Sequence, residues 1–229
     1  MAPFPGPPPQ PPTDPGQGPW GSQPVYSRAD DYAFFEVAAA AALAARAKGL
    51  RNASRHLVHY LNNTGSDLGV DPDQMMADEP AFKEHIDAIV TNSVQKIAAE
   101  APSSGITTTF QSEGWFDYTF SDRDWYLAMG SVEASASGLV TIHPRNTGSP
   151  QARITLDCQG HVFDRYNWDG TKETEIGGFT WSDEQLGALH TAGLAREFNM
   201  YGSSKTKHFE GLLPAGGPID LPSNPGSGR

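Results

Sequence analysis

Residues that can do chemistry gather in one stretch of the chain, 161–172, which reads His-Val-Phe-Asp-Arg-Tyr-Asn-Trp-Asp-Gly-Thr-Lys. Two carboxylates can work as a general acid and a general base when their surroundings separate their pKa values. Two carboxylates can also hold a divalent cation through oxygen ligands, with an amide as a neutral ligand. The candidate site residues of this stretch are Asp164, Arg165, Tyr166, Asn167, Asp169 and Lys172.

We expect each of these residues to have a particular role. Asp164 and Asp169 are expected to be central to catalysis and are the candidate ligands of a divalent cation, while Tyr166 and Asn167 orient the substrate. Arg165 or Lys172 would meet an anionic group such as phosphate. A purely structural interpretation stays open, in which Asp164 ends the strand, the aromatic rings pack, and Asp-Gly forms a turn.

A second group of candidates lies on a predicted C-terminal helix that begins at Ser182 with a capping box and ends before Gly202. By helical spacing, His190 and Glu197 share a face of this helix, with Arg196 to one side. We expect the helix to present them to Asp164, with His190 as a proton shuttle and with Arg196 and Glu197 at the substrate. The alternative is a core histidine bonded to a backbone carbonyl, with Glu197 paired to an arginine.

The elements that must position these residues begin with helices. The sequence predicts helices over 27–48, 51–61 and 79–99, and a brief one near 71–76, within a helical part at 27–101. The first helix is rich in alanine and nearly uncharged along its middle. A helix that is apolar on all sides is buried or inserted in a membrane, and its apolar run is too short to cross a bilayer.

After Pro102 the pattern changes to strands. Period-two alternation and turn residues predict strands over 106–110, 115–120, 125–135, 139–143 and 152–165. Sequential strands with short connections indicate an antiparallel meander of about five strands, with the clearest hairpin tip at 146–150. With the C-terminal helix packed on this sheet, residues 105–201 complete an α+β fold.

Proline, glycine and serine dominate both ends of the chain. Residues 1–25 are expected to form a proline-rich, disordered linker and residues 214–229 a disordered tail, around a single domain at 26–213. A stiff spacer makes most sense between two folded units. We therefore expect residues 1–25 to mark the seam with an upstream delivery module, and the alternative is a tail that partner domains bind.

Composition excludes several classes of protein. The net charge is −11, which argues against nucleic-acid binding through a basic face. The single cysteine, Cys158, rules out an intrachain disulfide. The sequence lacks an apolar run long enough for a transmembrane helix and lacks the basic and apolar regions of a classical signal peptide. The chain is therefore expected to be secreted or injected by another route, or otherwise to be cytoplasmic.

Several motifs lie at 59–65, 75–78, 124–130 (Asp-Trp-Tyr-Leu-Ala-Met-Gly), 162–172 and 189–198. Together they resemble the C-terminal effector domains of large actinobacterial secreted proteins of the polymorphic-toxin kind, and the resemblance covers residues 27–210. It implies an antibacterial toxin that travels with a cognate immunity protein.

Asp164-Arg165-Tyr166-Asn167 is also similar to the Asp-x-Tyr-Asp motif of colicin-M-type bacteriocins, except that Asn167 replaces the second carboxylate. The histidine-arginine pair of that family does not follow nearby, and only His190 could substitute for its histidine. The similarity implies a hydrolase that acts on a phosphate-containing substrate of the cell envelope, the undecaprenyl-linked peptidoglycan precursor. The alternatives are a pore-forming mode, through the alanine-rich helix, and a structural or cargo module.

Overall fold

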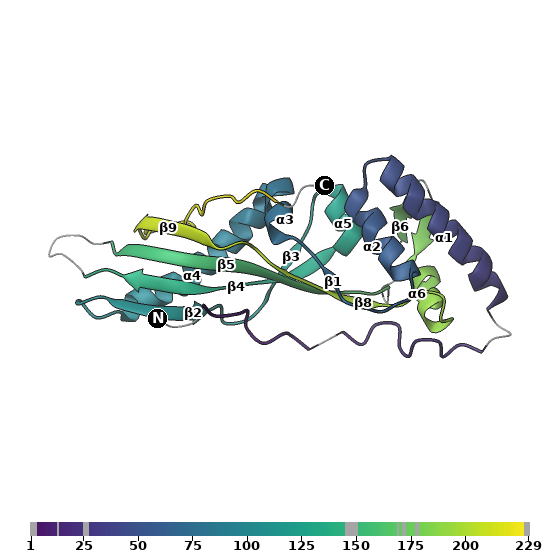
Figure 1. Cartoon of the computed structure of the whole chain (residues 1–229), viewed down its shortest axis with the longest axis horizontal. Coiled ribbons are helices and arrows are strands. Elements are labelled where there is room, and N and C mark those ends of the chain that lie inside the picture. The colour runs from purple at the N-terminus through teal and green to yellow at the C-terminus, as the bar shows by residue number, and fades with distance from the viewer. Residues whose placement is uncertain are drawn as a thin grey trace.

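The computed structural model describes residues 4–12, 14–24, 28–144, 151–168, 170, 173–176 and 179–226 of the chain. The fold is α+β, as the sequence predicts (Figure 1). A long twisted sheet is covered by helix α4 along one part of its length, with α3 beside α4, and helices α1, α2, α5 and α6 cluster at one end.

The predicted helices of the N-terminal part are confirmed. The N-terminal part contains α1 (Ala29–Ala47), α2 (Arg51–Leu61), α3 (Pro72–Asp78) and α4 (Pro80–Glu100). In α1 the fully buried residues are alanines, whose small side chains allow close packing against α2. The carboxylate of Asp71 caps α3 by accepting the backbone N–H groups of Asp73 and Gln74.

A long hairpin forms the centre of the main sheet. Its strands β4 (Ser131–Ile142) and β5 (Arg153–Tyr166) pair from Ile142 opposite Ile154 to Glu133 opposite Phe163. The expected tip at 146–150 lies outside the described residues. The flanking strands are β2 (Ile106–Gln111) and β3 (Phe116–Thr119) on β4, and β8 (Phe198–Ser203) and β9 (Lys207–Leu212) on β5. All these pairs are antiparallel, whereas the short β1 (Leu68–Gly69) runs parallel to β8.

The prediction of a strand over 125–135 is wrong in its first half. Residues Arg123–Met129 form helix α5, and a single strand then runs through the predicted break between 135 and 139. The Trp-Tyr-Leu sequence favours a strand locally, but two contacts override that preference. Asp122 caps α5, and Asp124 accepts the backbone N–H groups of Asn52 and Ala53 at the start of α2.

The predicted C-terminal helix is also too long. The capping box of Ser182 and Gln185 is present, but α6 spans only Asp183–Thr191. Gly193, at φ +74°, turns the chain. Residues 198–203 then pair with the free edge of β5 as β8, in place of the predicted last helical turns. A separate hairpin, β6 (Glu173–Ile176) with β7 (Phe179–Ser182), precedes α6.

Both ends of the chain make contacts with the rest of the structure. We call residues 4–24 the N-terminal strap, because it follows the molecule from the β2 end to the start of α1 (Figure 1). Near the C-terminus, Ile219 and Leu221 are buried, and the backbone N–H of Ile219 donates to Thr91 Oγ1. The division into linker, domain and tail stays a prediction. Within the described residues, no helix combines the length and apolarity needed to cross a membrane.

The hairpin leaves no room for a side chain at Gly138. A Cβ atom there would lie 2.4 Å from the backbone oxygen of Asp157 and 2.8 Å from Cε1 of Phe110. We expect Gly138→Ala to lower the free energy of unfolding by about 1–3 kcal/mol, as overpacking does in other cores. Urea denaturation measures this change, with Gly114→Ala as the control, since a Cβ at Gly114 meets nothing within 4 Å. Equal midpoints for the two variants would contradict the prediction.

Candidate functional site

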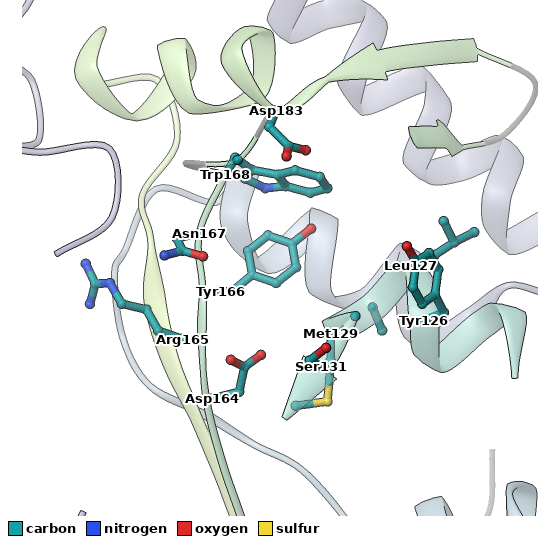
Figure 2. A pocket seen from close by; sticks show the side chains of 13 residues that line it. Tyr126, Leu127, Met129, Ser131, Asp164, Arg165, Tyr166, Asn167, Trp168 and Asp183 are labelled. Carbon is teal, nitrogen blue, oxygen red and sulfur yellow. The ribbon is translucent and has the colours of Figure 1, made fainter. Parts of the chain in front are cut away.

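Two cavities meet at the end of β5, because β5 continues beyond its pairing with β4. The ladder between the two strands ends at Glu133 and Phe163, while the last residues of β5 pair only with β8. One edge of Asp164–Tyr166 is therefore free. The first cavity, about 280 Å³, lies between this edge and the end of α5 (Figure 2).

The second cavity, about 340 Å³, involves β3, the start of β4 and the N-terminal strap. Ser131, Asp164, Arg165 and Asn167 contribute to the walls of both cavities. Three of the predicted site residues thus lie in the shared wall, and a fourth, Tyr166, lies in the wall of the first cavity alone. Asp169 and Lys172 lie outside the described residues, so their predicted roles stay predictions.

Asp164 is the carboxyl at the junction of the two cavities, and Figure 2 shows it directed toward the first. Burial raises the pKa of Asp164 well above its usual range, and the negative charges of Glu133 and Asp14 raise it further. The backbone N–H of Arg165 lowers the pKa, but this effect is smaller than the effect of burial. Asp164 therefore tends to keep its proton at a pH where exposed carboxyl groups have lost theirs.

Glu133 is a second carboxyl with a raised pKa in the wall of the second cavity. Burial is the larger cause, and the charge of Asp117 adds to it. Glu133, Asp117 and Asp14 are not among the candidates predicted from the sequence. One signal was available, since Glu133 is a charged residue between Val132 and Ala134 in a predicted strand. Asp117 and Asp14 come from a different strand and from the strap, and sequence spacing does not relate them to Asp164.

Arg165 turns away from the first cavity (Figure 2). Its Nη2 lies 3.0 Å from Oε2 of Glu197, and its Nη1 donates to Oδ1 of Asn199 at 3.3 Å. Glu197 is buried and its Oε1 also accepts the backbone N–H of Gln17 in the strap. Arg165 is thus a cation in the wall of both cavities whose charge is balanced by Glu197.

Tyr166 packs within a group of aromatic rings. Its ring stacks on Phe198 at 4.9 Å between centroids and contacts Tyr60 at 5.6 Å and Trp168 at 5.5 Å. Burial raises the pKa of the Tyr166 phenol, so this residue stays neutral. These contacts agree with the structural interpretation of Tyr166 and Trp168, and a role for Tyr166 in orienting the substrate stays a prediction.

His190 is not brought to the cavities. Its Nδ1 accepts the backbone N–H of Glu197 at 3.1 Å, and its Nε2 donates to the carbonyl of Gly18 at 3.0 Å. Because α6 ends at Thr191, the expectation that His190 and Glu197 share a helical face is wrong. They are nevertheless neighbours through the turn that follows the helix. The contacts match the alternative of a core histidine bonded to a backbone carbonyl.

Arg196 also lies away from the cavities. Its guanidinium sits 5.0 Å from the centroid of the Trp20 ring in the strap, which is a cation–π contact. Its backbone N–H donates to the carbonyl of Tyr60. Roles for Arg196 and Glu197 at the substrate stay predictions, and in this structure both residues hold the strap.

The described part of the chain contains no group of three or more His, Cys, Asp or Glu side chains placed to hold a metal ion. Asp169, the second proposed ligand, is outside that part. The divalent cation therefore stays a prediction, and we derive no step of the chemistry from it.

These observations define an α+β domain with a double cavity whose shared wall carries a carboxyl of raised pKa. No protein-family model and no curated protein matches the sequence. Two solved bacteriocin structures show a distant likeness. Truncated syringacin M from Pseudomonas syringae pv. tomato DC3000 has 14% identity and a TM-score of 0.37, over 72% of this chain and 61% of that one.

The second structure is PaeM, a colicin M-like bacteriocin of Pseudomonas aeruginosa, with 13% identity and a TM-score of 0.35, over 70% of this chain and 51% of that one. This chain thus spans less than two thirds of either bacteriocin chain. At these TM-scores the likeness assigns no function. We therefore argue the function from the site.

Proposed function

We propose that this chain is a toxin-like hydrolase domain in which Asp164 is the general acid. The observation that carries the proposal is a carboxyl of raised pKa in the wall shared by two cavities. A carboxyl whose pKa is raised keeps its proton to a higher pH and can donate that proton to the leaving oxygen of an ester. Perturbed carboxyl groups in clefts are typical of such sites.

Glu133 is the candidate for the matching general base. It lies in the wall of the second cavity, and its charge is one of those that raise the pKa of Asp164. A negative charge on Glu133 makes the ionisation of Asp164 more costly, which favours a state in which Asp164 is protonated and Glu133 is charged. In this state Glu133 accepts a proton from the attacking water, while Asp164 protonates the leaving oxygen.

The proposed substrate class is a phosphate ester of the cell envelope. Arg165 supports this choice, since guanidinium groups bind phosphate oxygens in a bidentate manner. To do so, Arg165 would exchange Glu197 or Asn199 for the substrate, from its place in the wall of both cavities. The similarity of Asp164-Arg165-Tyr166 to the colicin-M-type motif supports the same class.

The pore-forming alternative has less support from the structure. The alanine face that it would release from α1 is already buried, with Ala38, Ala41, Ala42 and Ala45 at 0% exposure. If the chain is an antibacterial toxin, secretion and a cognate immunity protein are part of the proposal, as is an upstream delivery module.

Expression of the full chain in the cytoplasm and, separately, in the periplasm of a bacterial host tests the proposed function. We expect growth arrest in the compartment where the substrate is accessible, because only there can the hydrolase meet it. Asp164→Asn should abolish the arrest. Asp157→Asn should not, since Asp157 is an exposed residue of the same strand that pairs with His208.

Wild-type chain that arrests growth in neither compartment would contradict the toxin proposal. Arrest that persists in folded Asp164→Asn would contradict the role of Asp164, and leakage of a dye from vesicles would then test the pore. Folding of each variant is checked by circular dichroism on the purified protein.

A further inference from the structure

The first part of the N-terminal strap is held through its backbone carbonyl oxygens. Gln111 Nε2 donates to the carbonyls of Gly6 and Pro7 at 3.0 and 2.9 Å, and Trp115 Nε1 donates to that of Pro9 at 2.8 Å. Ser137 Oγ donates to the carbonyl of Pro5 at 2.9 Å. Three side chains, which come from β2, the β2–β3 turn and β4, thus donate hydrogen bonds to four of the five carbonyl groups of residues 5–9.

This pattern suits a polyproline segment. Proline lacks a backbone N–H, so a proline-rich segment has few donors to offer to a neighbouring strand and is hydrogen-bonded mainly through its carbonyls. Proteins that bind polyproline use aromatic side chains and side-chain donors in this way. Here Trp115 supplies both, its ring contacts Phe163 at 6.1 Å between centroids, and Pro8 is buried between more exposed neighbours.

The donor at Ser137 has a fixed direction. His161 contacts Ser203 Oγ through Nδ1 (2.7 Å) and Ser137 Oγ through Nε2 (2.8 Å). Burial lowers the pKa of His161 to about 4, so at neutral pH the ring carries one proton. The carbonyl of Pro5 can only accept, so the single hydroxyl hydrogen of Ser137 is donated to Pro5. Ser137 must then accept from Nε2–H of His161, which leaves Nδ1 to accept from Ser203.

The second part of the strap has a separate set of anchors near α6. The backbone N–H groups of Gly21 and Gln23 donate to the carbonyls of His190 and Thr191, and Trp20 Nε1 donates to Oδ1 of Asn63. Between the two sets of anchors, Pro12 and Asp14 form part of the wall of the second cavity. The strap is therefore fixed at both ends and crosses the candidate site between them.

We propose that Gln111, Trp115 and Ser137 form a polyproline-binding groove, that residues 4–9 of the same chain occupy it, and that this occupancy keeps the second cavity covered by Pro12 and Asp14. The groove is a binding surface in its own right and does not depend on what the cavity does. The statement that its occupant regulates the site rests on the proposed function. Pulling the N-terminal segment out of the groove would uncover Glu133 and Asp164.

A bimane fluorophore on Gln10→Cys in the full chain tests the groove, because tryptophan quenches bimane at short range. Cys158 is fully buried, so the label goes to the exposed position 10. We expect the label to be quenched, and Trp115→Phe to restore its fluorescence. The peptide Phe-Pro-Gly-Pro-Pro-Pro-Gln-Pro-Pro, which matches residues 4–12, should also restore it at millimolar concentration, since the tethered segment competes at a similar effective concentration.

Two results would overturn the groove. One is fluorescence that does not change with Trp115→Phe, which would mean that position 10 is not near Trp115. The other is equal displacement by a peptide in which glycine replaces every proline, because flexible glycine lacks the preformed polyproline conformation. Gln111→Leu should raise the fluorescence of the labelled chain severalfold, since it removes the donor to two carbonyls while keeping the size of the side chain.

Growth arrest by Gln111→Leu tests the regulatory part. We expect this variant to arrest growth at a lower level of expression than wild type. If the bimane fluorescence shows that the segment leaves the groove, but the expression level needed for growth arrest is unchanged, the regulatory part is contradicted. The proposal of the groove is then unaffected. If wild type does not arrest growth at all, the proposed function fails, while the fluorescence result for the groove is unaffected.

Discussion

Asp164→Asn should remove the activity of this chain and at the same time make the fold more stable at neutral pH. Asparagine cannot donate the proton that a carboxylic acid donates, and loss of a general acid lowers the rate by about 10²- to 10⁴-fold. Asparagine also carries no charge to bury. If Asp164 mattered only for structure, its replacement by asparagine would instead lower the stability of the fold.

The sign of the stability effect follows from the raised pKa of Asp164. Because the folded state holds this proton more tightly than the unfolded state, stability is fully present below the unfolded pKa, about 3.9. It decreases as the pH rises toward the folded pKa. Asp164→Asn does not undergo this loss. Its midpoint in urea should exceed that of wild type at pH 7 and equal it at pH 3.5.

Asp157→Asn is the control for overall charge. The chain has a net charge of −11, so removal of any carboxylate relieves some repulsion. Asp157 is exposed and paired with His208, at 2.8 Å between Oδ1 and Nδ1, so its neutralisation removes the same charge without relieving burial. A stability gain in Asp157→Asn as large as in Asp164→Asn would contradict the role of burial.

Lys207→Met should be among the most destabilising single substitutions in the chain. Lys207 and Asp73 are almost completely buried, and Nζ lies 3.5 Å from Oδ1 of Asp73 and donates to the carbonyl of Pro222 at 2.9 Å. Removal of one partner leaves a buried charge uncompensated, which costs about 3–5 kcal/mol in comparable pairs. Urea denaturation of the variant measures this loss.

Two further variants separate the ion pair from other effects. Arg153→Met breaks the exposed pair with Glu210, and we expect little or no loss of stability, because solvent screens such a pair. Adding Asp73→Asn to Lys207→Met should recover part of the loss, since the uncompensated charge is then removed. A Lys207→Met variant that loses no more stability than Arg153→Met would show that the buried pair does not stabilise the fold.

Sequence periodicity predicted the regular elements wherever local preference and packing agree. The helices at 29–47, 51–61 and 80–100 and the β4–β5 strands follow from spacing and capping signals. The errors fall where long-range contacts prevail. Residues 123–129 are helical beside the N-terminus of α2, and residues 198–203 are a strand because β5 offers an unpaired edge.

The sequence by itself determined that Asp164, Arg165 and Asn167 would lie close together, because they are neighbours at the end of a single strand. Only the tertiary structure decided what surrounds them. The register of β4 on β5 leaves one edge of Asp164 free, and Glu133 and Asp14 reach it from β4 and from a segment 150 positions earlier in the chain. The pKa of Asp164 depends on this burial and on these charges, which no local pattern specifies.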